Sequence, residues 1–264
     1  MNKSILLMAV IAICFSACKK DPLASFPPEL TASKSGLIAS FDSLNKDMSA
    51  AAYFLGQNIN DSIVIRAKMM DLFSRTSFVL EFSFVTPQGI MKIIEPGIYH
   101  ATQGTDISQQ SHIVKAFQTK EPVLSETFLA VEGFYAAVDI HPIIHNGQLL
   151  GGVASLFYPQ AILGNIMNPL LKNQTFELWA MEKGGKMIFN QDLGEIGRNI
   201  FTDDLYKPFP ELIAAANKIA SEEYGETTYS FYQTGTNDVV VKRTYWVTYS
   251  LYGTEWKLVW VKPE

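Results

Sequence analysis

The 264-residue sequence contains only two cysteines, Cys14 and Cys18. Cys14 lies inside an apolar N-terminal segment, and we expect it to be removed with that segment. Cys18 would then be the single cysteine of the mature chain. One cysteine cannot form an intramolecular disulfide, so we expect a hydrophobic core to hold the exported part together.

Long hydrophobic runs are absent after residue 17, so the sequence predicts no later membrane-spanning helix. The first 17 residues, MNKSILLMAVIAICFSA, combine a basic Lys3 with an apolar run from Ser4 to Ala17. As a helix this run measures roughly 20 Å, against about 30 Å for the hydrocarbon core of a bilayer. Residues 1–17 therefore have the layout of a secretory signal peptide.

The small residues Ser16 and Ala17 directly precede Cys18, and the polar stretch KKD follows it. This pattern resembles a bacterial lipobox, in which the cysteine is diacylated and becomes the new N-terminus. Phe15 stands where that pattern usually has Leu, Val or Ile. We predict an extracytoplasmic protein attached by a lipid on Cys18 to the inner or the outer membrane. An ordinary cleaved signal with an incidental cysteine is the alternative.

Basic clusters and catalytic motifs are also lacking. The net charge is −5, and no basic run contains interleaved aromatic residues, which argues against a nucleic-acid partner. No G-x-S-x-G, P-loop, G-x-G-x-x-G or H-E-x-x-H motif is present. His141 and His145 would lie roughly 13 Å apart on a strand, too far to share a metal ion. We predict no enzymatic activity, no cofactor and no metal, and a hydrolase is only a remote alternative.

What the sequence does contain is two similar halves. Residues 18–34 include three prolines and are typical of a tether, and residues 35–75 show helical spacing of apolar residues. Each following half has the order strand, strand, helix and then strands, with turn signals such as Asn146-Gly147. We therefore predict an α+β fold with a long N-terminal helix and two PAS-like modules with antiparallel sheets, over residues 76–170 and 171–264.

Three segments resemble the double-Cache family of extracytoplasmic sensors. They are GTDISQQSHIVKAFQTKEPVLSETF, EGFYAAVDIHPIIHNGQLLGGV and GGKMIFNQDLGEIGRNIF. The resemblance implies a small-molecule pocket in the first module for an amine, an amino acid or an organic acid. Such domains usually form the outer part of chemoreceptors, sensor kinases or cyclases.

Two departures from that family limit the prediction. The amino-acid-binding members carry an Arg-x-Trp-Tyr cluster before the hairpin, and this sequence has none, so their ligand class does not transfer. No transmembrane helix or output domain follows the second half, so we expect a separate membrane receptor, kinase or transporter to act as partner.

The best candidate for ligand contact is the strand after Gly133. Alternation places Tyr135, Asp139 and His141 on one face of this strand. An Asp in an apolar strand is unfavourable unless it is paired, and a ligand amine would pair with it. The alternative is an internal bond from Asp139 to a loop or to His141.

Three further residues complete the predicted site. Tyr99 and His100 lie in a glycine-flanked loop that we expect to cover the pocket, unless the loop merely packs on the sheet. Phe128 lies on the predicted strand that precedes Gly133 and is either a ligand contact or a core residue. The sequence thus predicts a lipid-anchored small-molecule sensor, with a structural or protein-interaction lipoprotein as the alternative.

Overall fold

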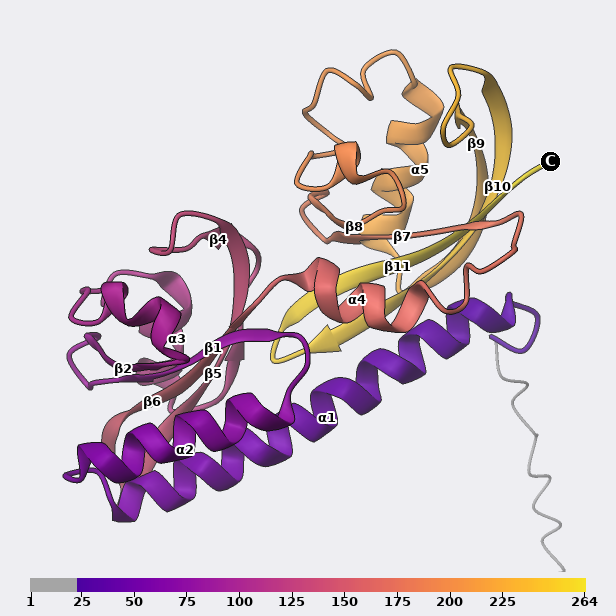
Figure 1. Cartoon of the computed structure of the whole chain (residues 1–264). Coiled ribbons are helices and arrows are strands. Elements are labelled where there is room, and N and C mark those ends of the chain that lie inside the picture. The colour runs from indigo at the N-terminus through magenta and orange to yellow at the C-terminus, as the bar shows by residue number, and fades with distance from the viewer. Residues whose placement is uncertain (1–22) are drawn as a thin grey trace, which may run out of the picture.

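The computed structural model describes residues 23–264, so the predicted signal peptide and Cys18 lie outside the described residues. A long helix runs beside two modules, each an antiparallel sheet with helices on it (Figure 1). This arrangement confirms the predicted α+β fold of two PAS-like modules behind an N-terminal helix. Among residues 23–264, no helix combines the length and hydropathy that a bilayer-spanning segment requires.

Helix α1 spans Pro28–Gln57, and α2, Ser62–Arg75, runs back along it (Figure 1). We predicted the helix from residue 35 and assigned residues 28–34 to the tether, and this boundary is wrong. Pro28 occupies the first turn of α1. Proline suits that place, because its fixed φ matches the helix and its missing N–H needs no partner there.

The start of α2 depends on Asp61, whose Oδ1 accepts hydrogen bonds from the backbone N–H groups of Ile63 and Val64, at 3.0 and 3.1 Å. We expect Asp61→Ala to lower the free energy of unfolding by about 1 kcal/mol, because two helix-end N–H groups lose their acceptor. Urea denaturation measures this change. Asp61→Ser keeps a capping oxygen and should retain most of the stability. Equal losses in both variants would contradict this role of the cap.

The first module is a six-stranded antiparallel sheet with the strand order β2-β1-β6-β5-β3, and β4 pairs with β5 outside that path. A 3-10 helix, η1, and helix α3 connect its strands. The elements of this module are β1 (Val79–Val85), β2 (Met91–Glu95), η1 (Gly97–Thr102), α3 (Ser111–Thr119), β3 (Val123–Leu124), β4 (Phe128–Leu129), β5 (Tyr135–His145) and β6 (Gln148–Phe157).

The second module follows α4 and has a five-stranded antiparallel sheet with the order β8-β7-β11-β10-β9. We predicted its helix over residues 205–223, but it begins at Pro210, again with proline in the first turn. The elements are α4 (Pro159–Met167), β7 (Glu177–Glu182), β8 (Met187–Phe189), η2 (Leu193–Glu195), α5 (Pro210–Ser221), β9 (Tyr224–Tyr232), β10 (Val239–Leu251) and β11 (Thr254–Pro263).

The first hairpins of the two modules share one pattern of backbone hydrogen bonds. Gly89 and Gly185 take positive φ at the two hairpin turns. The carbonyl of Gly89 accepts the N–H of Ile107, and that of Gly185 accepts the N–H of Ile200. The repeat in the sequence is therefore a repeat in backbone geometry.

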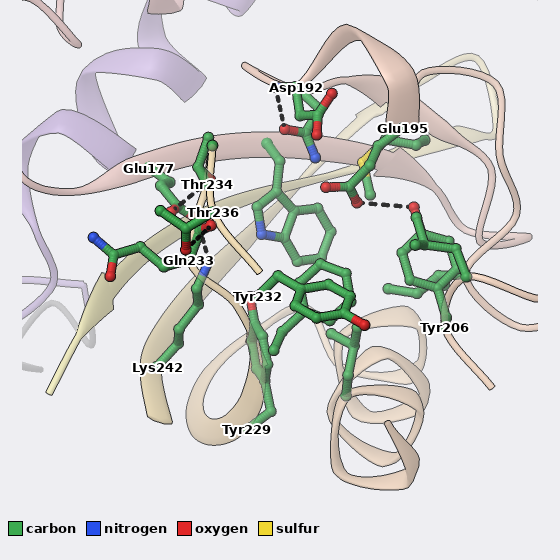
Figure 2. Close-up of a pocket in the computed structure, with 18 of the residues that line it drawn as sticks. Glu177, Asp192, Glu195, Tyr206, Tyr229, Tyr232, Gln233, Thr234, Thr236 and Lys242 are labelled. Atoms are coloured by element: carbon green, nitrogen blue, oxygen red, sulfur yellow. Dashed lines mark hydrogen bonds and ion pairs between the residues drawn. The ribbon is translucent and has the colours of Figure 1, made fainter. Parts of the chain in front are cut away.

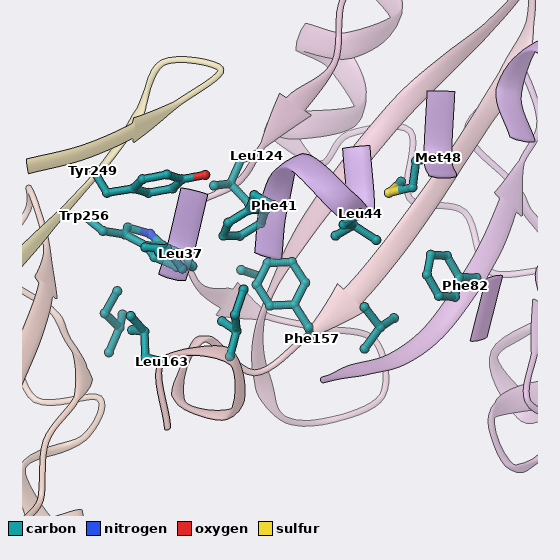
Figure 3. Packing of buried hydrophobic residues seen from close by; sticks show 14 of the residues in the cluster. Leu37, Phe41, Leu44, Met48, Phe82, Leu124, Phe157, Leu163, Tyr249 and Trp256 are labelled. Atoms are coloured by element: carbon teal, nitrogen blue, oxygen red, sulfur yellow. The ribbon is translucent and has the colours of Figure 1, made fainter. Parts of the chain in front are cut away.

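The face of α1 that turns toward the sheets packs against both modules. Phe41 is fully buried, and its ring lies 5.9 Å from that of Phe157 in the first module. It also lies 5.6 Å from the ring of Tyr249 and 5.7 Å from that of Trp256, both in the second module. Figure 3 shows Phe41 between these groups, so one continuous core joins the helix and both sheets.

Candidate functional site

The first module encloses a cavity between its sheet, helix α3 and the β4 segment. We call it the first-module cavity. Its polar walls come from strand β1, from α3 and from the turn before β5. The residues that matter below are Glu81, Ser83, Met91, His112, Phe128 and Glu132.

Glu81 projects from the middle of β1 into this cavity. Phe82 beside it packs in the α1 core, so strand alternation turns Glu81 and Ser83 to the opposite face. Glu81 is 2% exposed, and its Oε2 has no hydrogen-bond partner among the described residues. Burial, and secondarily the charge of Glu132, raise the pKa of Glu81 to about 8. Oε1 of Glu132 is likewise buried without a described partner.

His112 of α3 lies on the same cavity. Its side chain is buried, and burial lowers the pKa of His112 to about 4. The ring centroid lies 4.8 Å from that of Phe128. A neutral imidazole and two carboxyl groups therefore share one cavity, and no described cationic side chain lines it to pair with the carboxylate forms.

The β4 segment closes the cavity and also contacts the second module. Phe128 lines the cavity. Its neighbour Thr127 is hydrogen-bonded to two residues of the second module. The backbone N–H of Thr127 donates to Oε1 of Glu182, and Nζ of Lys186 donates to the carbonyl of Thr127, at 3.0 Å. A movement of Phe128 would therefore be transmitted through Thr127 to two residues of the second module.

The first-module cavity has a volume of about 20 Å³. This is room for roughly one water molecule. A metabolite fits only if the β4 segment moves outward. That segment is short and pairs with β5 at two positions, and Leu129 within it is exposed.

Asp139 and His141 lie on the opposite face of the first sheet from this cavity. The predicted alternation of β5 holds, but its polar face is the one that α1 covers, so the assignment of that face to the pocket is wrong. Oδ1 of Asp139 lies 3.5 Å from Nε2 of His141. Nδ1 of His141 lies 3.2 Å from Oγ of Ser49, and its Nε2 lies 3.3 Å from Oδ1 of Asn45, both on α1. The alternative pairing of Asp139 with His141 is the one observed.

Asp139 is fully buried, and neither of its carboxylate oxygens has a good hydrogen bond among the described residues. Burial raises the pKa of Asp139, and the nearby His141 opposes that rise. The ring of Tyr252, from the turn between β10 and β11, lies 5.9 Å from that of His141. This polar cluster therefore joins α1, the first sheet and the second module.

The other four predicted residues lie at three places. Tyr99 packs beside the first-module cavity, where burial and the charges of Tyr158, Glu81 and Glu132 raise the pKa of Tyr99. Phe128 lines the cavity itself. Ligand binding by these two residues stays a prediction.

His100 and Tyr135 lie away from the cavity. His100 is exposed, with its Nε2 3.1 Å from Oε1 of Glu95. Tyr135 is 62% exposed and stands in a groove between the modules, where Nζ of Lys186 lies 5.1 Å from the centre of its ring. Neither is brought together with Asp139, so the six predicted residues do not form one site.

Glu81, His112 and Glu132 are not among the site residues predicted from the sequence. Glu81 carries the same signal as Asp139, because it is an acid inside the apolar strand VLEFSFV. His112 and Glu132 carry no comparable signal in the sequence. Over residues 23–264, no group of three or more His, Cys, Asp or Glu side chains is arranged to hold a metal ion.

Comparison with known proteins shows similarity to extracellular sensor domains. Residues 39–159 match the family model described as "HK/GC/Chemotaxis protein-like, sensor domain". The structure of an extracellular ligand-binding receptor from Desulfohalobium retbaense is similar, with a TM-score of 0.76 and 27% identity over 90% of this chain. Residues 39–159 are therefore similar to sensor domains of the Cache type. The chain spans 40% of the length of the Desulfohalobium receptor.

Ligand-binding domains of chemoreceptors share the fold of this chain. The ligand-binding domain of PctB from Pseudomonas aeruginosa, in complex with L-Gln, has a TM-score of 0.64 at 14% identity, over 90% of this chain and 89% of that one. The domain of CtaA from Pseudomonas fluorescens, in complex with L-alanine, has a TM-score of 0.65 at 14% identity, covering 90% and 95%. The comparison with curated proteins found no significant match.

Proposed function

We propose that the protein is an extracytoplasmic, non-enzymatic sensor that binds a small ammonium-bearing metabolite in the first-module cavity. The observation that carries this proposal is the pair Glu81 and Glu132, two carboxylates with unpartnered oxygens in one enclosed cavity. Buried carboxylates are strongly unfavourable as anions unless a cation pairs with them. A ligand ammonium group supplies that cation.

The similar structures support the same class of ligand. PctB and CtaA were solved with L-Gln and L-alanine, which carry an α-ammonium group. This chain lacks the Arg-x-Trp-Tyr cluster of amino-acid-binding members, so recognition of the ligand carboxylate is not carried over. The carboxylate pair therefore favours an amine or amino acid over an organic acid.

Ligand entry would be communicated to the second module through Thr127. A ligand larger than one water molecule displaces Phe128, and Thr127 next to it is bonded to Glu182 and Lys186. The second module would then pass the change to a membrane receptor, kinase or transporter. The lipid alone transmits no conformational change.

The start of α1 supports an orientation for the anchored protein. The ring of Phe26 lies 5.4 Å from that of Tyr245 and 6.2 Å from that of Tyr224, both in the second module. The chain between Cys18 and Phe26 spans at most roughly 30 Å. A lipid on Cys18 therefore places the second module near the membrane and the first module away from it.

A ligand screen tests the proposal. We expect at least one compound from a panel of L-amino acids and aliphatic amines to raise the melting temperature of the purified protein, because it binds only the folded state. Simple dicarboxylates should give no shift. Glu81→Gln should abolish the stabilisation by at least one such compound, and Glu121→Gln, which changes an exposed acid of the same module, should leave it intact.

If every stabilising compound still stabilises Glu81→Gln to the same extent, the first-module cavity is not the binding site. The small cavity volume favours one second candidate, a protein-interaction lipoprotein whose own side chains fill the pocket. That candidate predicts no stabilisation by any compound of the panel.

A further inference from the structure

The second module has its own cavity in the place equivalent to the first-module cavity. Each is lined by a glutamate ten residues before a methionine, Glu81 with Met91 and Glu177 with Met187. The hairpins that carry them share the backbone pattern described above, which also places Ile107 and Ile200 equivalently. The repeat therefore builds two cavities, and we call this one the second-module cavity.

The two cavities differ in size. The second-module cavity has a volume of about 220 Å³, against about 20 Å³ in the first module. Drug-sized ligands occupy roughly 300 Å³ or more, so this space suits a small molecule. No element needs to move to create it.

Glu177, the equivalent of Glu81, differs from it in having an ion-pair partner and a hydrogen-bond partner. Oε2 of Glu177 lies 2.7 Å from Nζ of Lys242, which is buried, and its Oε1 accepts a hydrogen bond from Thr234. The Lys242 charge thus compensates Glu177. Figure 2 shows these residues on one side of the cavity, with Asp192 and Glu195 on the opposite side.

Asp192 and Glu195 have no cation of their own on the cavity wall. Oε2 of Glu195 accepts a hydrogen bond from the hydroxyl of Tyr206 at 2.9 Å, and Asp192 accepts one from the backbone N–H of Gly194. Among the described residues that line the cavity, Lys242 is the one cationic side chain, and it is already paired with Glu177. The lining therefore carries an excess of two carboxylates.

Aromatic side chains form much of the remaining wall. Trp179, Tyr229 and Phe231 are buried there, and Figure 2 shows Tyr229 and Tyr232 below the two polar sides. The face of an aromatic ring attracts cations. The attraction between an ammonium group and the rings is stronger when the ammonium group is desolvated. Burial raises the pKa of Glu195, the Tyr206 hydrogen bond opposes this, and the charge of Asp192 adds to the rise.

We infer that the second-module cavity binds a small aliphatic ammonium compound, whose charge pairs with Asp192 and Glu195 while its carbon chain packs on the aromatic wall. This site is separate from the first-module cavity. The protein would thus hold two ligands, one in each module.

Three probes of similar length test the charge requirement: 1,4-diaminobutane, 1,4-butanediol and succinate. We expect titration calorimetry to detect binding of the diamine to the purified protein, and not of the neutral diol or the dianion. Glu195→Gln removes one charge and keeps an acceptor for Tyr206, and it should weaken binding by roughly tenfold or more. Asp192→Asn, at an exposed position, provides a second variant should the first fold poorly.

The control is Glu226→Gln, which removes an exposed acid on β9 outside the cavity and should leave binding unchanged. NMR gives a direct readout, because the indole N–H resonance of Trp179 should shift with the diamine. No diamine binding, or equal binding of succinate, would overturn the inference. Binding that Glu81→Gln abolishes and Glu195→Gln leaves unchanged would also overturn it, while supporting the first-module site.

Discussion

Replacing Phe41 by alanine should lower the free energy of unfolding by about 3–5 kcal/mol, because the change leaves a large cavity in a fully buried aromatic cluster. For a chain of this size we expect the melting temperature to fall by roughly 6 to 20 °C. Both modules should lose stability together, since Phe41 contacts Phe157 on one side and Tyr249 and Trp256 on the other. Calorimetry and urea denaturation measure the change.

The matched control is Tyr53→Ala on the same helix. Tyr53 is 72% exposed, so its removal should change stability by less than about 0.5 kcal/mol. A loss in Phe41→Ala that is confined to one module, seen as a second transition at the unchanged temperature, would contradict a core shared by α1 and both sheets.

Glu81→Gln should stabilise the unliganded protein at pH 8. The pKa of Glu81 rises from 4.5 to about 8 on folding. A raised folded-state pKa contributes stability that is present below pH 4.5 and is lost as the pH rises toward 8. Glutamine does not titrate, so the variant avoids this loss. The gain at pH 8 should amount to a few kcal/mol, with about 5 kcal/mol as the upper bound for a shift of this size.

The pH series separates Glu81 from His112. The pKa of His112 falls from 6.5 to about 4 on folding, so its contribution to stability is lost as the pH falls from 6.5 toward 4. Melting temperatures measured between pH 6.5 and 8 therefore report mainly on Glu81. Glu121→Gln should show no pH-dependent gain over this range. A Glu81→Gln variant that is no more stable than the unmodified protein at pH 8 would show that Glu81 is already compensated.

The prediction for Glu81→Gln connects stability with ligand binding. Glu81 lowers stability in the unliganded protein, as groups arranged for binding often do. A bound ammonium group would remove that penalty, so stability and ligand affinity should change in opposite directions in Glu81→Gln.

The α+β order of elements and the repeat could be predicted from the sequence, because each depends on local patterns. The signal peptide and the lipid on Cys18 stay predictions. Helical spacing of Leu37 and Phe41 predicts a buried stripe, and alternation in β5 predicts two faces. The predicted start residue was wrong for two helices that begin with a proline. Pro28 was assigned to the tether, and Pro210 was placed inside a helix predicted from residue 205, whereas each proline occupies the first turn of its helix.

The tertiary structure alone decided which face of each strand carries a site. Alternation separates two faces but does not say which one a helix covers, so Asp139 was predicted in a pocket and lies under α1 instead. Glu81, His112 and Glu132 are far apart in the chain, and only the folded sheet and α3 bring them to one cavity.

The same limit applies to the two modules. Their order of elements marks them as repeats, yet Glu81 is unpartnered and Glu177 pairs with Lys242, a difference that depends on contacts between distant strands. Local sequence patterns thus determined the elements and the repeat of this chain. Packing between distant segments determined where charge is buried and where space for a ligand remains.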